Sequence, residues 1–120
     1  MQASTLRQAL WAPATVVAVA LVLGRLPAID ALWSLLHVLG GAALAHCFIR
    51  LREDYLLAFA LACTGALAWE LSEFGIDQFL GTDLQEGRVD TTSDLALGVC
   101  GAALYLSFAA LAAWRARAGR

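Results

Sequence analysis

The stretch Trp69–Leu97, WELSEFGIDQFLGTDLQEGRVDTTSDLAL, organises this chain of 120 residues. It holds seven of the ten acidic residues, whereas the sequence on either side is largely apolar. Carboxylates inside or beside a membrane are energetically costly, so their presence requires a structural or functional reason. The stretch therefore indicates where a polar site lies in an otherwise apolar protein.

The composition predicts an integral membrane protein whose principal partner is the lipid bilayer. Apolar residues make up 61% of the chain, charged residues only 15%, and the mean hydropathy is +0.71. A soluble protein of this size needs a polar exterior that this composition cannot supply. The basic residues are all arginines and form no basic tract, so the chain lacks the electrostatic footprint of a nucleic-acid-binding protein.

Four apolar segments predict an all-α fold, a polytopic membrane protein with four transmembrane helices in a compact bundle. The length favours a single transmembrane domain over residues 1–120. The spans are expected at about 8–26, 29–49, 55–78 and 92–114. The first span covers roughly 28 Å at about 1.5 Å per residue, close to the thickness of the bilayer core.

The beginning of the chain allows two interpretations. We expect a retained first helix with Pro13 in its first turns, where the missing N–H is least harmful, and a turn at residues 24–27. A cleaved signal peptide is the alternative, but no small-residue cleavage site follows the apolar run.

The distribution of arginines predicts the orientation. With four spans, six arginines fall on the side of the two termini and two on the opposite side. The positive-inside rule therefore places both termini in the cytoplasm of a bacterial inner membrane. The connection around residues 78–90 then faces outward, which in a Gram-negative cell means the periplasm.

Helical spacing places part of the acidic stretch on one helix face. Glu70, Glu73 and Asp77 fall within roughly a 60° arc at about 100° per residue. The same face continues backwards into Ala62 and Ala66, so it is small near one end and acidic near the other. Such a face allows close approach of another helix.

Two further faces have the same character. Asp90 and Asp94 are four residues apart, and their face continues into Gly98 and Gly101. In the second span, His37 lies about 10 Å from the outer end of its helix, on a face that also carries small residues. A helical hairpin would bring the acidic faces together. We therefore interpret a set of glycines as close-packing positions: Gly40, Gly41, Gly65, Gly98 and Gly101.

These faces predict one outward-facing polar site with Arg88 at its rim. Its members are His37, Glu70, Glu73, Asp77, Asp90 and Asp94. One imidazole and several carboxylates suit a divalent cation such as Mn, Fe, Zn, Ca or Mg, so all six are candidate metal ligands. The same groups suit a proton relay or general acid–base chemistry, with Glu70, Glu73 and Asp77 as catalytic candidates. His46 faces the opposite side of its helix and cannot share a metal with His37.

Simpler structural roles remain open for several of these residues. Thr91 and Asp94 resemble a capping box that starts the last helix, and Asp90 would gain from the dipole of that helix. For Glu70 and Glu73, the alternative to a functional site is a structural ion pair.

The remaining charged and aromatic residues have structural interpretations too. Arg88 can pair with Asp77 or Glu86 at the water interface, and Asp83 and Glu86 are expected to be solvated loop residues. Five aromatic residues near the span ends are expected at the membrane interface: Trp11, Trp33, Tyr55, Trp69 and Trp114.

The spacing also resembles a known family. Trp69-Glu70-x-x-Glu73-x-x-x-Asp77, followed by Gln85-x-Gly87-x-x-Asp90-Thr91-x-x-Asp94, Gly98 and Gly101, resembles the YjdF-like family of uncharacterised bacterial inner-membrane proteins. It is more distantly similar to VanZ-like proteins. The resemblance covers about residues 66–104 and includes His37 with its neighbouring glycines. VanZ-like chains often carry an Asp-Lys pair before the helical histidine, which this chain lacks, and YjdF-like proteins look longer. The resemblance implies the location of the polar site and a cell-envelope context.

These patterns define one functional hypothesis and two alternatives. We expect an inner-membrane protein whose acidic and histidine-containing site binds a divalent metal and a polar or lipid headgroup. The alternatives are a small proton-coupled transporter and a structural or assembly subunit, acting as a homo-oligomer or with a membrane-complex partner. The chain has no Walker loop, nucleophile elbow, HExxH motif or dinucleotide fingerprint, so whether it is an enzyme stays open.

Overall fold

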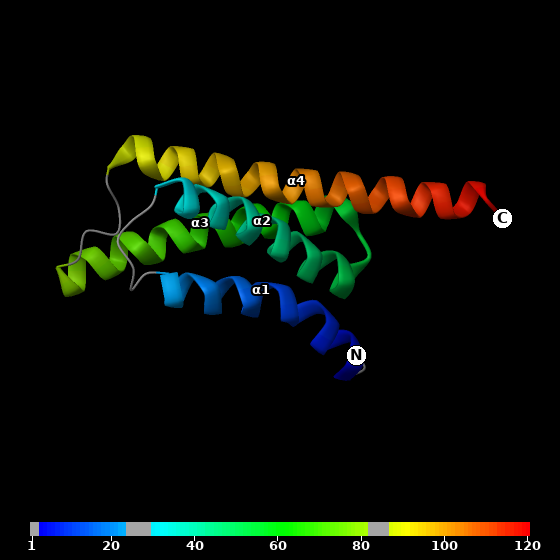
Figure 1. Ribbon diagram of the computed structural model, residues 1–120, viewed down its shortest axis with the longest axis horizontal. Coiled ribbons are helices and arrows are strands. Elements are labelled where there is room, and N and C mark those ends of the chain that lie inside the picture. Colours follow the sequence, from blue (N-terminus) through cyan, green and yellow to red (C-terminus); the bar gives the residue numbers. More distant parts are fainter. Residues whose placement is uncertain (1–2, 24–29, 82–86) are drawn as a thin grey trace.

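The computed structural model describes residues 3–23, 30–81 and 87–120, and in these ranges it contains four helices and no strand (Figure 1). The helices are α1 (Ala3–Leu23), α2 (Asp30–Arg52), α3 (Tyr55–Leu80) and α4 (Arg88–Ala118). All four are long and apolar enough to cross a membrane. The predicted all-α bundle of four transmembrane helices is therefore confirmed.

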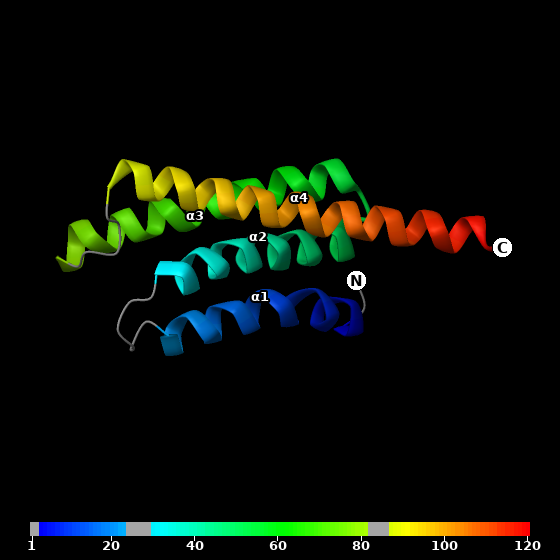
Figure 2. The ribbon, with the colours of Figure 1, turned by 45° about the horizontal axis from the view of Figure 1, so that its top comes forward.

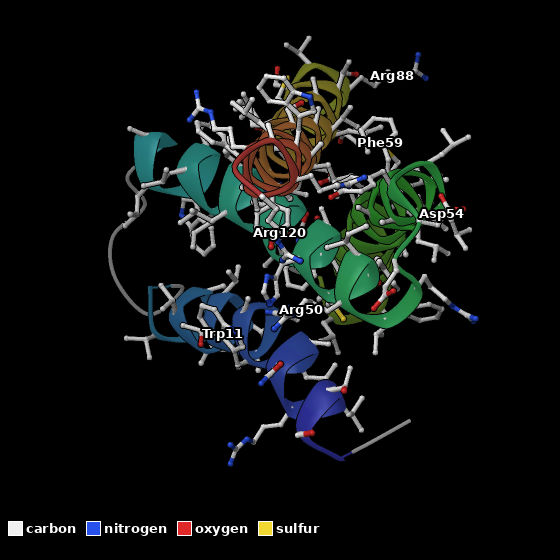
Figure 3. All side chains as sticks on the ribbon, turned by 90° about the vertical axis from the view of Figure 1, so that its right-hand side faces the viewer. Trp11, Arg50, Asp54, Phe59, Arg88 and Arg120 are labelled. Atoms are coloured by element: carbon white, nitrogen blue, oxygen red, sulfur yellow. The ribbon has the colours of Figure 1, made fainter. Side chains whose placement is uncertain are left out.

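Helix α2 lies at the centre of the bundle. It packs against each of the other three helices, and α3 also packs against α4. In the described part of the chain, α1 packs only against α2. Figure 3 looks along the bundle and shows α1 on one side of α2 and α4 on the other. Figure 2 likewise shows α1 next to α2, which leaves α1 and α3 without direct packing.

Helices α2 and α4 touch backbone to backbone. A Cβ atom on Gly41 would overlap the backbone carbonyl of Gly98, and one on Gly101 would overlap that of Val38. Small residues permit this approach, and the resulting van der Waals contact is a main source of helix association in a lipid environment. The predicted close-packing role of glycine is confirmed at these positions.

The course of α1 differs from the expectation. The helix begins at Ala3, so Pro13 lies in its interior and the prediction that it occupies the first turns was wrong. Residues 3–7 contain no glycine or proline, so the helix extends through them towards the N-terminus. Pro13 has no N–H to donate to the carbonyl of Ala9, which bends a helix, and Figure 1 shows such a bend in α1. The turn expected at 24–27 and the end of the first span lie outside the described residues.

The start of α4 also differs from the expectation. The helix begins at Arg88 after Gly87, which provides no side-chain cap. Thr91 lies inside the first turns, and its hydroxyl donates to the Gly87 carbonyl at 3.2 Å. Thr92 and Ser93 donate in the same way to carbonyls four residues earlier. The capping-box interpretation of Thr91 was therefore wrong, because these hydroxyls are satisfied within the helix itself.

A cluster around His46 of α2 contacts α1 on one side and α4 on the other, at the end of the bundle that carries the termini. The Nε2 atom of His46 lies 2.9 Å from the Gln8 carbonyl oxygen, and Nδ1 lies 2.6 Å from the Tyr105 hydroxyl. Because a carbonyl only accepts, Nε2 donates to Gln8, and in the tautomer with its hydrogen on Nε2 the Nδ1 atom accepts from the Tyr105 hydroxyl. Arg50 donates to the Gln8 side chain at 2.8 Å, and the Trp11 ring meets His46 edge-on. His46 thus belongs to a different cluster from His37.

We expect Tyr105→Phe to lower the free energy of unfolding by about 0.5–1.5 kcal/mol, because it removes the hydrogen bond donated to His46. The thermal midpoint of the purified protein in detergent measures this change. Tyr55→Phe is the matched control, since Tyr55 lies at the exposed start of α3. Equal midpoints for the two variants would show that the Tyr105 hydroxyl does not stabilise the cluster.

Candidate functional site

Three helices cross at a layer of small residues. These residues, one from each helix, are Gly41 of α2, Ala66 of α3 and Gly98 of α4. A Cβ atom on Gly98 would lie 3.4 Å from the Cβ atom of Ala66, so α3 approaches the α2–α4 contact closely. The layer fixes how far apart the three helices stand at this level.

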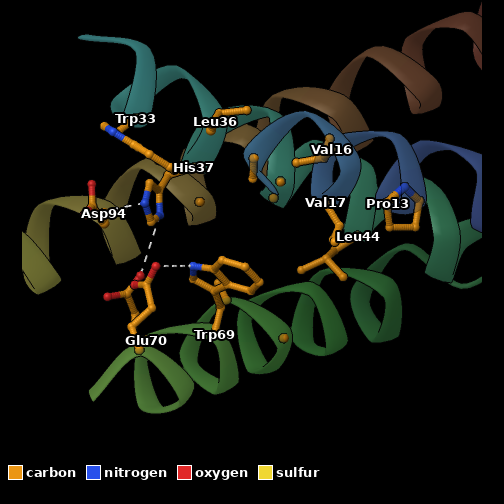
Figure 4. A pocket seen from close by; sticks show the side chains of 17 residues that line it. Pro13, Val16, Val17, Trp33, Leu36, His37, Leu44, Trp69, Glu70 and Asp94 are labelled. Carbon is orange, nitrogen blue, oxygen red and sulfur yellow. Dashed lines mark hydrogen bonds and ion pairs between the residues drawn. The ribbon is translucent and has the colours of Figure 1, made fainter. Parts of the chain in front are cut away.

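One helical turn away, each helix carries a polar side chain. These are His37, Glu70 and Asp94, which we call the polar triad. In α2 and α4 the polar residue comes four positions before the glycine, and in the oppositely directed α3 it comes four positions after the alanine. The close packing of the small residues therefore brings the three side chains together, as Figure 4 shows.

His37 lies between the two carboxylates. Its Nδ1 atom is 3.6 Å from Glu70 Oε1, and its Nε2 atom is 3.5 Å from Asp94 Oδ2. Both ring nitrogens therefore face a carboxylate oxygen, one from α3 and one from α4. The Glu70 side chain is only 5% exposed. Among the residues that the structure describes, Glu70 is the one charged residue that is buried. The polar triad thus links α2 to both α3 and α4 through one imidazole.

Glu73 joins the site through Trp69. The indole Nε1–H of Trp69 donates to Glu73 Oε1 at 2.8 Å, which orients this carboxylate one turn from Glu70. Trp69 was expected at the membrane interface, but it lies in the middle of α3. The spacing of four residues between Trp69 and Glu73 was the signal in the sequence, because such pairs meet on one helix face.

A cavity of about 170 Å³ extends from the polar triad towards α1. Its polar end is formed by the polar triad and Glu73, and two indoles, Trp33 and Trp69, also line it. The apolar wall comes mainly from α1 and α2: Pro13, Val16, Val17, Ala20, Leu36 and Leu44. Figure 4 shows Pro13, Val16 and Val17 at one end and the polar triad at the opposite end.

The cavity lies where α1 and α3 do not pack against each other. Residues of both helices line it, and α2, which packs against each of them, supplies much of the rest of its wall. For comparison, an apolar cavity of about 150 Å³ can bind a benzene-sized group. The site therefore has room for part of an apolar chain next to buried polar groups.

The predicted site residues separate into two sets. Four line the cavity: His37, Glu70, Glu73 and Asp94. Asp77 and Asp90 do not line it, and Asp90 occupies the first turn of α4, where a carboxylate benefits from the helix dipole. Arg88 is exposed at the start of α4 and does not form part of the cavity wall. Asp83 and Glu86 lie outside the described residues.

The side-chain geometry does not support the metal interpretation. Within residues 3–23, 30–81 and 87–120, no group of three or more His, Cys, Asp or Glu side chains could hold a metal ion. Metal binding by the six predicted residues stays a prediction.

One comparison with known proteins gave a match. The model of a family described as "Predicted membrane protein (DUF2238)" matches residues 28–115. This range contains α2, α3, most of α4 and all six predicted site residues. No curated protein and no solved structure matches the chain. The YjdF-like and VanZ-like resemblance stays a prediction.

Proposed function

Because the chain belongs to the DUF2238 family of predicted membrane proteins, whose description names no reaction, we propose its function from the geometry of the cavity. The protein binds an amphiphile of the membrane. The apolar part of the amphiphile lies along α1, and its headgroup contacts the polar triad and Glu73. The observation that carries this proposal is that the same cavity has both an apolar wall and a buried polar end.

The packing of α1 supports entry from the bilayer. Val17 lines the cavity and is nevertheless 44% exposed, so the wall of the cavity continues to the lipid-facing surface. Since α1 packs only against α2 among the described helices, an acyl chain can enter between α1 and α3 without crossing a helix contact. Amphiphiles dissolved in the bilayer are already present at that surface.

We further propose the orientation and setting of the protein. One transmembrane domain spans the bacterial inner membrane with both termini in the cytoplasm, and the polar triad lies nearer the periplasmic side. Figure 1 shows both termini at one end of the bundle. That end also carries Arg50 and Arg52 at the end of α2 and Arg115 and Arg117 at the end of α4, in line with the positive-inside rule.

A second candidate function is supported by the polar triad itself. His37 connects a carboxylate of α3 with one of α4, and such chains of Asp, Glu and His serve as proton relays in membrane transporters. If the protein is a small proton-coupled transporter, liposomes that contain it would show a pH-dependent flux, and the Glu70→Gln variant would not. The enzyme, assembly-subunit and homo-oligomer hypotheses stay predictions.

We expect Val17→Trp to reduce the amphiphile that co-purifies with the protein by at least tenfold, because the indole would fill the space along α1. Lipid extraction and mass spectrometry of detergent-purified protein measure the bound amount. Val19→Trp is the matched control, because Val19 is 41% exposed on the same helix but does not line this cavity. Equal lipid content in wild type and both variants would refute the proposed function.

A further inference from the structure

The polar end of the cavity is negatively charged. Three carboxylates line it, from Glu70, Glu73 and Asp94, against the single imidazole of His37. When these carboxyl groups are ionised they outnumber the imidazole, so the site is negative even if His37 is protonated. None of the arginines in the described part of the chain lines the cavity. In a medium of low dielectric constant such a site favours a cationic ligand and disfavours an anionic one.

Two indole rings border the same space. Trp33 and Trp69 both line the cavity, and Figure 4 shows Trp33 beside His37 and Trp69 beside Glu70. The face of an indole attracts a cation within about 6 Å of the ring centre, and this attraction increases when the cation is desolvated. The hydrogen bond from Trp69 to Glu73 restrains the Trp69 ring. The aromatic groups thus provide a second, independent preference for positive charge.

We propose that the headgroup recognised by this site is an ammonium group carried on an apolar chain; this inference rests on the amphiphile-binding function proposed above. The ammonium donates hydrogen bonds to the carboxylates of Glu73 and Asp94 and lies against the indole faces. Glu73 can accept from Trp69 and from the ligand together, because a carboxylate offers about four lone-pair directions. The chain of the amphiphile follows the apolar wall along α1.

Two sources supply this chemistry, and they can be distinguished. One is a membrane phospholipid with an ethanolamine headgroup, and the other is a single-chain alkylamine. Native mass spectrometry of the protein in non-ionic detergent can compare phosphatidylethanolamine, phosphatidylglycerol and dodecylamine, each added at the same concentration. Preferential binding of either amine-bearing probe supports the inference and identifies the source.

We expect the preferred amine probe to bind at least tenfold more tightly than phosphatidylglycerol. Glu73→Gln should reduce this preference at least tenfold, because it neutralises a cavity carboxylate without altering the polar triad. Glu53→Gln is the control, since Glu53 is an exposed residue between α2 and α3. Circular dichroism and size-exclusion chromatography verify that both variants are folded.

The failures of the two proposals are distinguishable. Equal binding of all three probes, a preference for phosphatidylglycerol, or a Glu73→Gln variant that keeps the wild-type preference would overturn the ammonium inference while leaving amphiphile binding intact. No detectable binding of any probe, together with unchanged lipid content in Val17→Trp, would overturn both.

Discussion

Gly41→Ala is expected to lower the thermal midpoint of the protein by roughly 5–20 °C, equivalent to about 1–3 kcal/mol for overpacking a closely packed contact. The added methyl group would overlap the backbone carbonyl of Gly98, and a backbone cannot yield as a flexible side chain can. Helices α2 and α4 must therefore move apart. Because His37 and Asp94 lie one turn from this contact, their separation should increase as well.

The experiment has an internal control in α3. Gly75 is also a helical glycine, but a Cβ atom there would have no neighbouring atom within 4 Å among the described residues. Gly75→Ala should leave the midpoint unchanged or raise it, since alanine favours a helix over glycine by about 1 kcal/mol. Thermal unfolding of both variants in the same detergent provides the comparison. If Gly41→Ala is as stable as Gly75→Ala, the close contact between α2 and α4 does not exist in the protein.

Removal of His37 is expected to have the largest effect on stability at the site itself. In His37→Ala, Glu70 and Asp94 would face each other without the imidazole between them. Breaking a buried ion pair by removing one partner typically costs about 3–5 kcal/mol, because the remaining charge is left uncompensated. We expect most of this variant to aggregate at a temperature at which the wild type remains monodisperse in size-exclusion chromatography.

A double variant tests whether that loss arises from charge. Glu70→Gln removes one of the two carboxylates while keeping the size of the side chain. His37→Ala combined with Glu70→Gln should therefore recover at least half of the stability that His37→Ala loses. Residues in direct contact show such non-additive behaviour, whereas independent sites do not. Additive losses in the double variant would mean that His37 acts through packing and not by compensating the carboxylates.

Several features of the site could be predicted from the sequence because they depend on one helix at a time. Spacing along α3 puts Ala66 and Glu70 on one face, and spacing along α4 does the same for Asp94 and Gly98. The structure brings both faces together at His37. The same local reasoning failed where a helix extended further than expected, as at Pro13, since the end of a helix depends on contacts as well as on breakers.

The sequence by itself determined that this is a membrane protein of four helices, because the length and apolarity of each segment are local properties. It also determined which face of each helix is small and polar, because helical periodicity is fixed by backbone geometry. Only the tertiary structure decided that α1 stands apart from α3 and leaves a cavity, and that Asp77 and Asp90 lie outside it. The physical reason is that helix partners and rotations result from many weak packing contacts between distant segments, which no single helix encodes.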